Sequence, residues 1–404
     1  MRGNLREVHD ERFPDGNPKG LQFFRSMQVR RLFIQMEERK QCNGGAKMTF
    51  LCIGDSIFDD IQEFISFLEY DKSGSHLPSN LQIVATISAF ETINEFIENL
   101  VKFGFLIEKK YGKLLLISKS INNRKIYYYA FFDDRNNVPL FLTSARKTDD
   151  IPETLLDYIK RARDISNLWI TPRIMRELKD RLIEEHDDLI ITYFSAKRTP
   201  DSNIRAEYRP EISRGIQYRG IDGRQALDEM EFYYGVLPKI LEIWLPNGVA
   251  FRIDNKGIIT LLKGNFGNVF KIIESVIDKL IALRNAIGES NYTIYKVGIN
   301  NQFTHMIQTP WSVILPTRMR LDDIPGFCRA LGEEEWDFTV LEDMLLKESM
   351  FSARLIDNNN SSVFDIETSG DSIDIYPVEQ ADIGSYIKFY EFLVENVDSQ
   401  AVVG

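Results

Sequence analysis

The sequence predicts an α+β protein in which a small N-terminal domain precedes duplicated antiparallel sheet units, each covered by one helix. Two patterns predict this class. Segments such as Phe251–Ile259 and Phe364–Ile373 place apolar and aromatic residues on both sides of a Gly-containing turn, which is typical of β-hairpins. Each hairpin is followed by apolar residues at helical spacing, in Phe266–Glu274 and in Ile383–Glu391, which indicates an amphipathic helix. At 404 residues the chain has room for two or three domains.

Composition and charge restrict the class of function. The chain carries 49 Lys and Arg against 60 Asp and Glu, a net charge of −11. Such a chain is not expected to bind nucleic acid over its whole surface, although a local basic patch remains compatible with DNA binding. Its three cysteines, Cys42, Cys52 and Cys328, are too scattered for a disulfide framework. No apolar run reaches the roughly 18 residues that would cross a membrane, so we expect a cytoplasmic protein without a membrane partner.

Residues 1–47 differ from the rest of the chain because they are basic and show little apolar periodicity. The codons for Gly44-Gly45 can contain a ribosome-binding sequence shortly before Met48. Our hypothesis is that the natural protein is prokaryotic and starts at Met48, and that residues 1–47 are an upstream extension. The alternative is that these residues form a genuine basic arm.

The segment from residue 55 to residue 118 gives the most specific indication of function. Apolar residues from Ile57 to Leu68 share one helical face, and Ala89–Phe103 is a second amphipathic helix that Gly104 ends. Two short strands then enclose a lysine-rich turn, Lys109–Lys113. Between the two helices, Leu81–Ser88 alternates well enough to be a strand, so we leave open whether it is a helix or a strand.

This order resembles a winged helix-turn-helix domain. The resemblance implies that Ala89–Phe103 is the recognition helix, that Thr92 and Asn94 contact DNA bases, and that the wing contacts phosphates. The wing residues are Lys109, Lys110 and Lys113. The exposed side of the helix carries three carboxylates, which is the wrong charge for phosphate, so the wing lysines would have to supply most of the affinity. The alternative is a strand–helix–hairpin unit of an α+β domain, which would not bind DNA.

A repeated pattern fills the remainder of the chain. Tyr193–Lys197 and Met350–Arg354 share an aromatic-Ser-Ala-basic core, and each precedes one of the hairpin-and-helix segments above. Ala130–Leu142 followed by Pro152–Ala162 is a plausible third example. Such a unit buries its apolar side only when it is paired with another. The duplicated arrangement is similar to TATA-binding-protein-like and helix-grip folds, in which helices back a curved antiparallel sheet.

The first duplicated unit is longer than the second. When Ser195 is matched to Ser352 and Gly267 to Gly384, the additional residues are roughly 199–238. This insertion contains five arginines and no lysine: Arg205, Arg209, Arg214, Arg219 and Arg224. Guanidinium groups bind planar anions and stack on aromatic rings, so we expect these residues to contact an anion or a protein partner. The alternative is that they pair with the acidic residues of the same insertion.

No known catalytic, nucleotide-binding or metal-binding motif occurs, so we assign no catalytic residue, metal or cofactor. Two weaker possibilities involve carboxylates. Asp365, Glu367 and Asp374 would lie on adjacent strands and could hold Mg²⁺ for a nuclease. His186 lies in an acidic run and could bind a cation, although a solvated helix end explains it as well.

We therefore expect a prokaryotic regulator or binding protein that binds DNA through its winged-helix-like domain and senses a ligand or partner through its duplicated domain. The expected divisions are a basic extension (1–47), the winged-helix-like domain (48–120), a connecting unit (121–188) and two repeats (189–290 and 291–404). The main alternative is a protein-interaction or defence component that does not bind DNA, acting on a protein partner or as a homodimer. A metal-dependent nuclease is the third hypothesis, and the favoured interpretation is not an enzyme.

Overall fold

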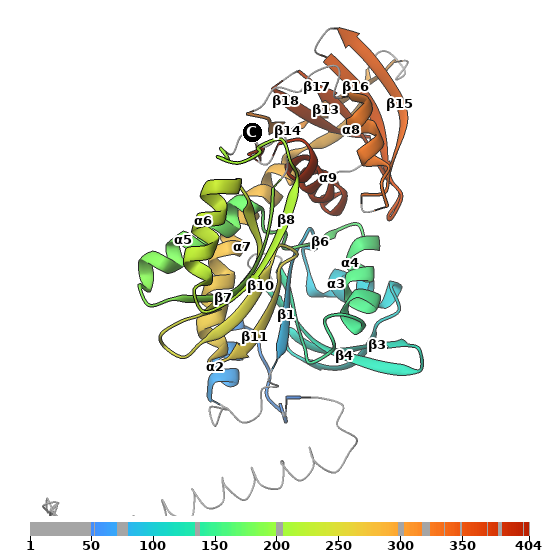
Figure 1. Cartoon of the computed structure of the whole chain (residues 1–404). Helices are drawn as coiled ribbons and strands as arrows, with labels where there is room; N and C mark the ends of the chain where they lie inside the picture. Colours follow the sequence, from blue (N-terminus) through green and yellow to red (C-terminus); the bar gives the residue numbers. More distant parts are fainter. Residues whose placement is uncertain are drawn as a thin grey trace, which may run out of the picture. The chain divides into compact units, whose positions relative to one another are not determined.

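The structure is a computed structural model of the chain (Figure 1). It describes residues 50–51, 53–70, 80–133, 138–198, 205–297, 303–316, 324–334, 336–347, 350–369, 371–378, 382–398 and 400–403. The predicted basic extension, residues 1–47, lies outside the described residues. The chain divides into two compact units, Met1–Ser56 and Ile57–Gly404. In the first unit the Ser56 N–H donates to the Ile53 carbonyl at 3.3 Å, and the remainder of the description concerns the second unit.

In the second unit the order of elements repeats three times: a strand, a helix, a four-stranded meander and a further helix (Figure 1). Repeat A (residues 81–161) contains β1 (Leu81–Ser88), α3 (Ile93–Lys102), β2 (Leu106–Tyr111), β3 (Leu114–Ile121), β4 (Arg124–Asp133), β5 (Val138–Thr143), the π-helical turn η1 (Pro152–Leu156) and α4 (Asp157–Arg161). Repeat B (165–289) contains β6 (Ile165–Asn167), α5 (Pro172–Glu185), β7 (Ile190–Arg198), β9 (Leu237–Trp244), β10 (Ala250–Asp254), β11 (Ile258–Lys263) and α7 (Phe266–Glu289). Repeat C (311–396) contains β14 (Trp311–Ile314), α8 (Ile324–Leu331), β15 (Phe338–Lys347), β16 (Met350–Asp357), β17 (Ser362–Thr368), β18 (Ser372–Pro377) and α9 (Ile383–Asn396).

Six described elements lie outside this pattern. They are α2 (Ile61–Tyr70) before repeat A, β8 (Arg214–Arg219) and α6 (Gly223–Tyr234) inside repeat B, the hairpin β12 (Asn291–Val297) and β13 (Phe303–Thr309), and β19 (Val402–Val403). Among the described strands, repeats A and B form one 11-stranded antiparallel sheet, and repeat C forms most of a six-stranded one. The predicted α+β class with antiparallel sheets is therefore confirmed.

The two meanders of the large sheet flank a shared central strand, β1. The strand order is β2-β3-β4-β5-β1-β11-β10-β9-β7-β8, and the eleventh strand, β6, pairs with the end of β1 off this path. β1 is antiparallel to β5 on one side and to β11 on the other, with Gln82 opposite both Thr143 and Thr260. β5 and β11 consequently run in the same direction. Two meanders arranged in this way are related by an approximate twofold rotation about the direction of β1. This rotation turns the sheet over, so equivalent residues of the two meanders face opposite sides of the sheet.

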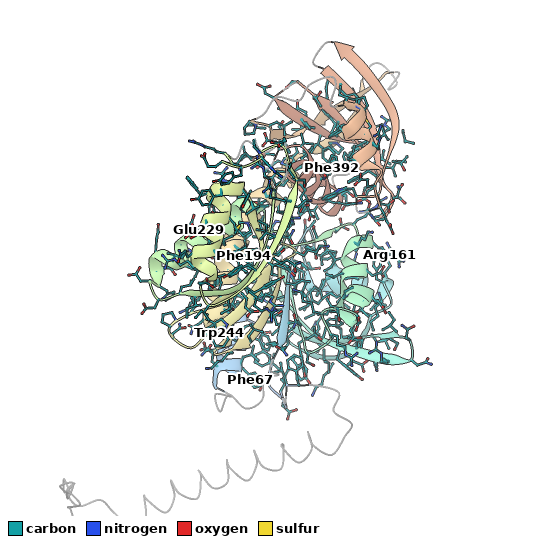
Figure 2. The ribbon with its side chains drawn as sticks, viewed as in Figure 1. Phe67, Arg161, Phe194, Glu229, Trp244 and Phe392 are labelled. Carbon is teal, nitrogen blue, oxygen red and sulfur yellow. The ribbon has the colours of Figure 1, made fainter. Side chains whose placement is uncertain are left out.

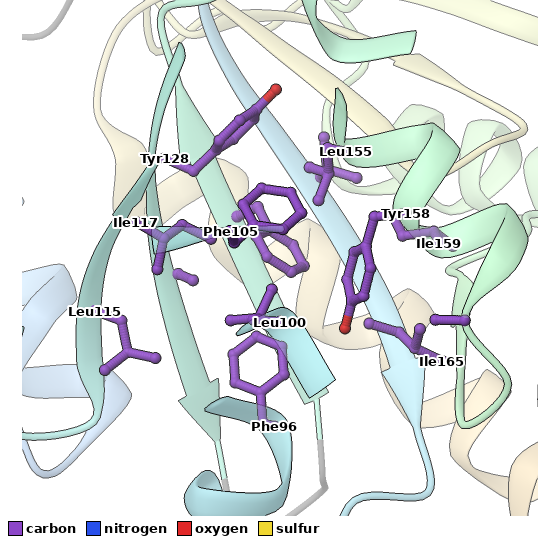
Figure 3. Packing of buried hydrophobic residues seen from close by; sticks show 14 of the residues in the cluster. Phe96, Leu100, Phe105, Leu115, Ile117, Tyr128, Leu155, Tyr158, Ile159 and Ile165 are labelled. Atoms are coloured by element: carbon purple, nitrogen blue, oxygen red, sulfur yellow. The ribbon is translucent and has the colours of Figure 1, made fainter. Parts of the chain in front are cut away.

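Each face of the large sheet is covered by different helices. On one face, Val84 of β1 belongs to an apolar cluster with Phe96 and Leu100 of α3 and Tyr158 of α4 (Figure 3). On the other face, Phe64 of α2 stacks on Phe131 of β4 with ring centroids 5.9 Å apart, and α7 contacts both α2 and β1. The apolar residues of the strands therefore account for the position of the helices on both faces.

The winged helix-turn-helix prediction was wrong, because Leu81–Ser88 is a strand. All eight residues of β1 are buried at the centre of the sheet, where its apolar and β-branched side chains contact helices on both faces. The β2–β3 hairpin continues into β4 and β5 rather than ending as a wing. The structure corresponds to the alternative, a strand–helix–hairpin unit of an α+β domain. The expected boundary at residue 120 falls inside β3.

The repeated hairpins and helices lie where the sequence places them, but one correspondence was wrong. β10–β11 precede α7, β17–β18 precede α9, and β4–β5 precede η1 and α4. Ser195, however, is on β7, the first strand of its meander, whereas Ser352 is on β16, the second. The expected insertion, residues 199–238, contains β8 and α6, which separate β7 from β9. In repeat C, β15 pairs directly with β16 as a hairpin.

Candidate functional site

The residues expected to contact DNA are divided between a helix end and a hairpin. Thr92 is the N-cap of α3: its hydroxyl oxygen accepts from the Glu95 N–H at 3.3 Å, which is a structural role. Asn94 is exposed on the first turn of α3. Lys109 and Lys110 are exposed on the edge strand β2, and Lys113 is half-buried beside its turn.

Other basic residues near this hairpin are held in ion pairs. The Lys125 ammonium lies 2.7 Å from the Glu108 carboxylate. Hydrogen bonds from Lys125 and from the Ser118 hydroxyl lower the pKa of Glu108, with burial opposing them. Arg124 pairs with Asp150 at 3.0 Å. The three wing lysines lie on this hairpin without the recognition helix that the resemblance implied, and the Lys109 ammonium lies 4.7 Å from the centroid of the Tyr111 ring.

The five arginines of the insertion do not form one anion site. The Arg205 guanidinium pairs with Glu207 at 2.9 Å, and the Arg224 guanidinium donates to the Asp187 carbonyl at 3.0 Å. Arg214 lies over the Tyr234 ring and donates to the carbonyl of Arg209, and Arg219 lies over Tyr193. Four of the five therefore have separate intramolecular partners, of which one is an acidic residue of the insertion.

Sequence reasoning missed the residue that fixes the insertion, Arg198. Its side chain at the end of β7 is only 2% exposed. The guanidinium donates to the Pro210 carbonyl at 3.0 Å and to the Gly235 carbonyl at 3.3 Å. Burial lowers the pKa of Arg198, and the nearby Arg214 charge adds to this. The indication in the sequence was its position two residues after Ala196, on the buried side of an alternating strand.

The insertion forms most of an open groove with apolar and charged walls, which we call the α6 groove. Its volume is about 540 Å³. It is lined by Leu189, Ile221, Asp222, Arg224, Gln225, Asp228, Glu229, Phe232 and Tyr233. Ile221 is 85% exposed and Phe232 is 62% exposed. Tyr208, which is 56% exposed, extends this surface because its ring centroid lies 5.5 Å from that of Tyr233.

Buried contacts hold α6 in place beneath this groove. Leu227 is fully buried on the sheet side of α6. The Lys179 ammonium of α5 is 3% exposed and lies 3.0 Å from Asp228 and 3.2 Å from Glu231. These carboxylates raise the pKa of Lys179, although burial alone would lower it. Figure 2 labels Glu229 on α6 and Phe194 on the neighbouring strand β7.

The carboxylates considered for a nuclease have other partners. The Arg354 guanidinium binds Asp365 through two hydrogen bonds of 2.7 and 2.9 Å. The Ser312 hydroxyl donates to Asp374, which lies opposite Glu367 in the sheet. Within the part of the chain that the structure describes, no group of three His, Cys, Asp or Glu residues could hold a metal ion. His186 ends α5, and its backbone N–H donates to the Leu182 carbonyl.

None of the described helices is long and apolar enough to cross a membrane.

Taken together, the fold and the groove define a class: an α+β protein of three repeats whose middle repeat carries an inserted strand and helix. A family model described as a family middle domain matches residues 173–256, from the first turn of α5 to the β10–β11 turn. An uncharacterized protein of Archaeoglobus fulgidus is 30% identical over 354 residues, which is 85% of this chain and 95% of that protein. The chain belongs to the same family as this protein.

No solved structure matches the chain. The similarity to TATA-binding-protein-like and helix-grip folds therefore stays a prediction. The family model covers the whole insertion, residues 199–238, together with the elements on either side of it. The α6 groove thus lies within the residues that this family model matches.

Proposed function

We propose that this chain is a protein-interaction component and that the α6 groove binds its protein partner. The observation that carries the proposal is the exposure of Ile221, Phe232, Tyr208 and Tyr233 on one inserted helix and its flanking loops. Large apolar side chains that cluster on a surface are typical of protein interfaces. Aromatic residues in particular contribute a large share of interface binding energy.

The supports of α6 favour binding without rearrangement. The Lys179 cluster and the buried Leu227 fix the inner side of the helix, so its outer side is presented on a rigid element. A preformed surface loses less conformational entropy when a partner docks. The contacts that hold α6 exist before the partner binds, so the partner binds more tightly than it would to a helix that had to be ordered on binding.

The charges around the groove indicate the chemistry of the partner. Three carboxylates line it, Asp222, Asp228 and Glu229, of which Asp228 is paired with Lys179, against one lining arginine, Arg224, so the lining carries more negative than positive charge. A protein segment with apolar side chains and flanking Lys or Arg residues complements this surface. An acidic segment would be repelled by it.

The proposal is tested with a photo-crosslinking residue in place of Phe232 in cells of the source organism. We expect one discrete adduct, and an adduct of twice the chain mass of 46.9 kDa would identify a second copy as the partner. The matched control places the same residue at Leu341, which is 51% exposed in repeat C. Equal adducts at both positions, or an adduct that persists after Ile221→Glu, would contradict the proposal.

DNA binding through Lys109, Lys110 and Lys113 is a second proposed function. It is supported by the position of these lysines on an edge hairpin, where a duplex can approach them. A protein partner explains more of the observations, because it accounts for the exposed Ile221 and Phe232, which DNA contact through the hairpin leaves unexplained.

A further inference from the structure

A second cavity lies where the three repeats meet, and we call it the junction pocket. Its volume is about 180 Å³. Repeat A contributes α4, repeat B contributes the residues around β6 and the β10–β11 turn, and repeat C contributes α9 and the β16–β17 turn. The pocket is therefore complete only when all three repeats are folded against one another.

Each repeat supplies one lysine to this pocket: Lys160, Lys256 and Lys388. The Lys388 ammonium lies 2.7 Å from the buried Asp357 carboxylate. Burial lowers the pKa of Lys388, Asp357 opposes this shift, and the charge of Lys160 adds to it. Lys160 and Lys256 are exposed at the rim, and neither forms an ion pair with any residue that the structure describes. The Glu391 carboxylate also lines the pocket, so beside the Lys388–Asp357 pair the lining carries two ammonium groups against one carboxylate, a net positive charge.

Two buried polar atoms in the wall of the pocket lack partners. Trp169 is 1% exposed, and its indole Nε1–H meets no hydrogen-bond acceptor among the described residues. The Asn167 side-chain oxygen, also buried, meets no donor within the same residues. Both residues line the pocket. Native proteins rarely leave such groups unsatisfied, and each exception calls for an explanation.

Part of the remaining wall is apolar: Leu156 of η1, Ile159 of α4 and the Trp336 ring, which is 4% exposed, line it beside the polar Ser166 and Asn360. A dry cavity of about 150 Å³ is large enough to hold benzene, so a pocket of about 180 Å³ accepts a ring or a short branched chain. It is too small for a nucleotide or a peptide.

We propose that the junction pocket binds a small organic anion, a carboxylate or phosphate ester with a compact apolar body. The anionic group lies between Lys160 and Lys256, the Trp169 indole donates to it, and the body packs against Trp336. This site is separate from the α6 groove and does not depend on the proposed partner.

Isothermal titration calorimetry of the full chain tests this with four probes: benzoate, phenyl phosphate, benzamide and inorganic phosphate. We expect saturable binding of benzoate or phenyl phosphate, and the stronger of the two distinguishes a carboxylate from a phosphate ligand. Benzamide lacks the charge and inorganic phosphate lacks the apolar body, so both should bind at least about tenfold more weakly, which corresponds to ~1.4 kcal/mol.

Variants locate the binding site. The double variant Lys160→Met and Lys256→Met should lose at least about tenfold in affinity, or ~1.4 kcal/mol, and Trp169→Phe should weaken binding while keeping an aromatic ring. Lys263→Met, an exposed lysine on β11 away from the pocket, is the matched control and should bind as the unmodified chain does. Binding that is unchanged in the double variant overturns the proposal, as does no saturation by either aromatic anion at millimolar concentration. Equal affinity for benzoate and benzamide overturns the anionic assignment.

Discussion

Gly235→Ala should destabilise the chain far more than an alanine at another glycine of the same backbone conformation. Gly235 ends α6 with φ +59°, and a Cβ atom there would lie 2.1 Å from Nη1 of the buried Arg198. Gly248 has φ +82° and no atom within 4 Å of such a Cβ. Gly248→Ala should therefore cost only the left-handed backbone penalty of about 1–2 kcal/mol.

Gly235→Ala incurs the same penalty and also displaces the Arg198 guanidinium. That group loses its hydrogen bonds to the Pro210 and Gly235 carbonyls, and each hydrogen bond of a charged group contributes about 1.5–3 kcal/mol. The expected total is about 4–8 kcal/mol, as a free energy of unfolding measured by urea denaturation followed by circular dichroism. Limited proteolysis should locate the first cleavage in residues 205–236. Equal destabilisation by the two alanines would refute the role assigned to Arg198.

Three further predictions concern other parts of the chain. The triple variant Lys109→Ala, Lys110→Ala and Lys113→Ala should abolish any gel shift of genomic DNA at low salt, whereas a shift that survives would exclude these lysines from DNA contact. Lys179→Met leaves the half-buried Glu231 with Arg176, 3.4 Å away, as its remaining cation and should cost about 1.5–3 kcal/mol in the urea assay, more than Asp228→Asn, because Asp228 is exposed. Burial and the charge of Asp382 raise the pKa of Asp164 above its ordinary 3.8, so its ionisation opposes folding. Asp164→Asn should therefore raise the urea midpoint at pH 7 and lose this advantage below pH 3.8, and a constant difference across pH would contradict the assignment.

The α+β class could be predicted because hairpins and helices leave local patterns. Gly257 marks the turn between β10 and β11, and the apolar spacing from Phe266 onward predicts α7. The identity of Leu81–Ser88 could not be settled in this way. Its polar residues Gln82, Thr86 and Ser88 are as buried as its apolar ones, so polarity does not mark which side of the segment faces solvent, and a run of eight residues suits a strand or a short helix. The error at Ser195 and Ser352 has a related cause, since a short strand motif reports alternation but not the place of the strand in its sheet.

The candidate sites were less accessible from the sequence. The insertion was located because it interrupts one repeat, but its arginines drew attention away from Ile221 and Phe232, whose exposure depends on which side of α6 faces the sheet. The junction pocket has no local pattern at all. Lys160, Lys256 and Lys388 come from three separate repeats, and only the packing of those repeats brings them to one cavity.

The shared strand β1 has a consequence for how the protein is made. Leu81 pairs with Leu261, so the first half of one edge of β1 has no native partner until the ribosome has synthesised β11, nearly the whole of repeat B later. Only the last residues of β1, Thr86–Ser88, find a partner earlier, in β6. Pairing between segments so distant in the chain is slow to form, and an exposed strand edge invites association with other chains. The growing chain therefore passes through a long interval in which the centre of its largest sheet is incompletely paired.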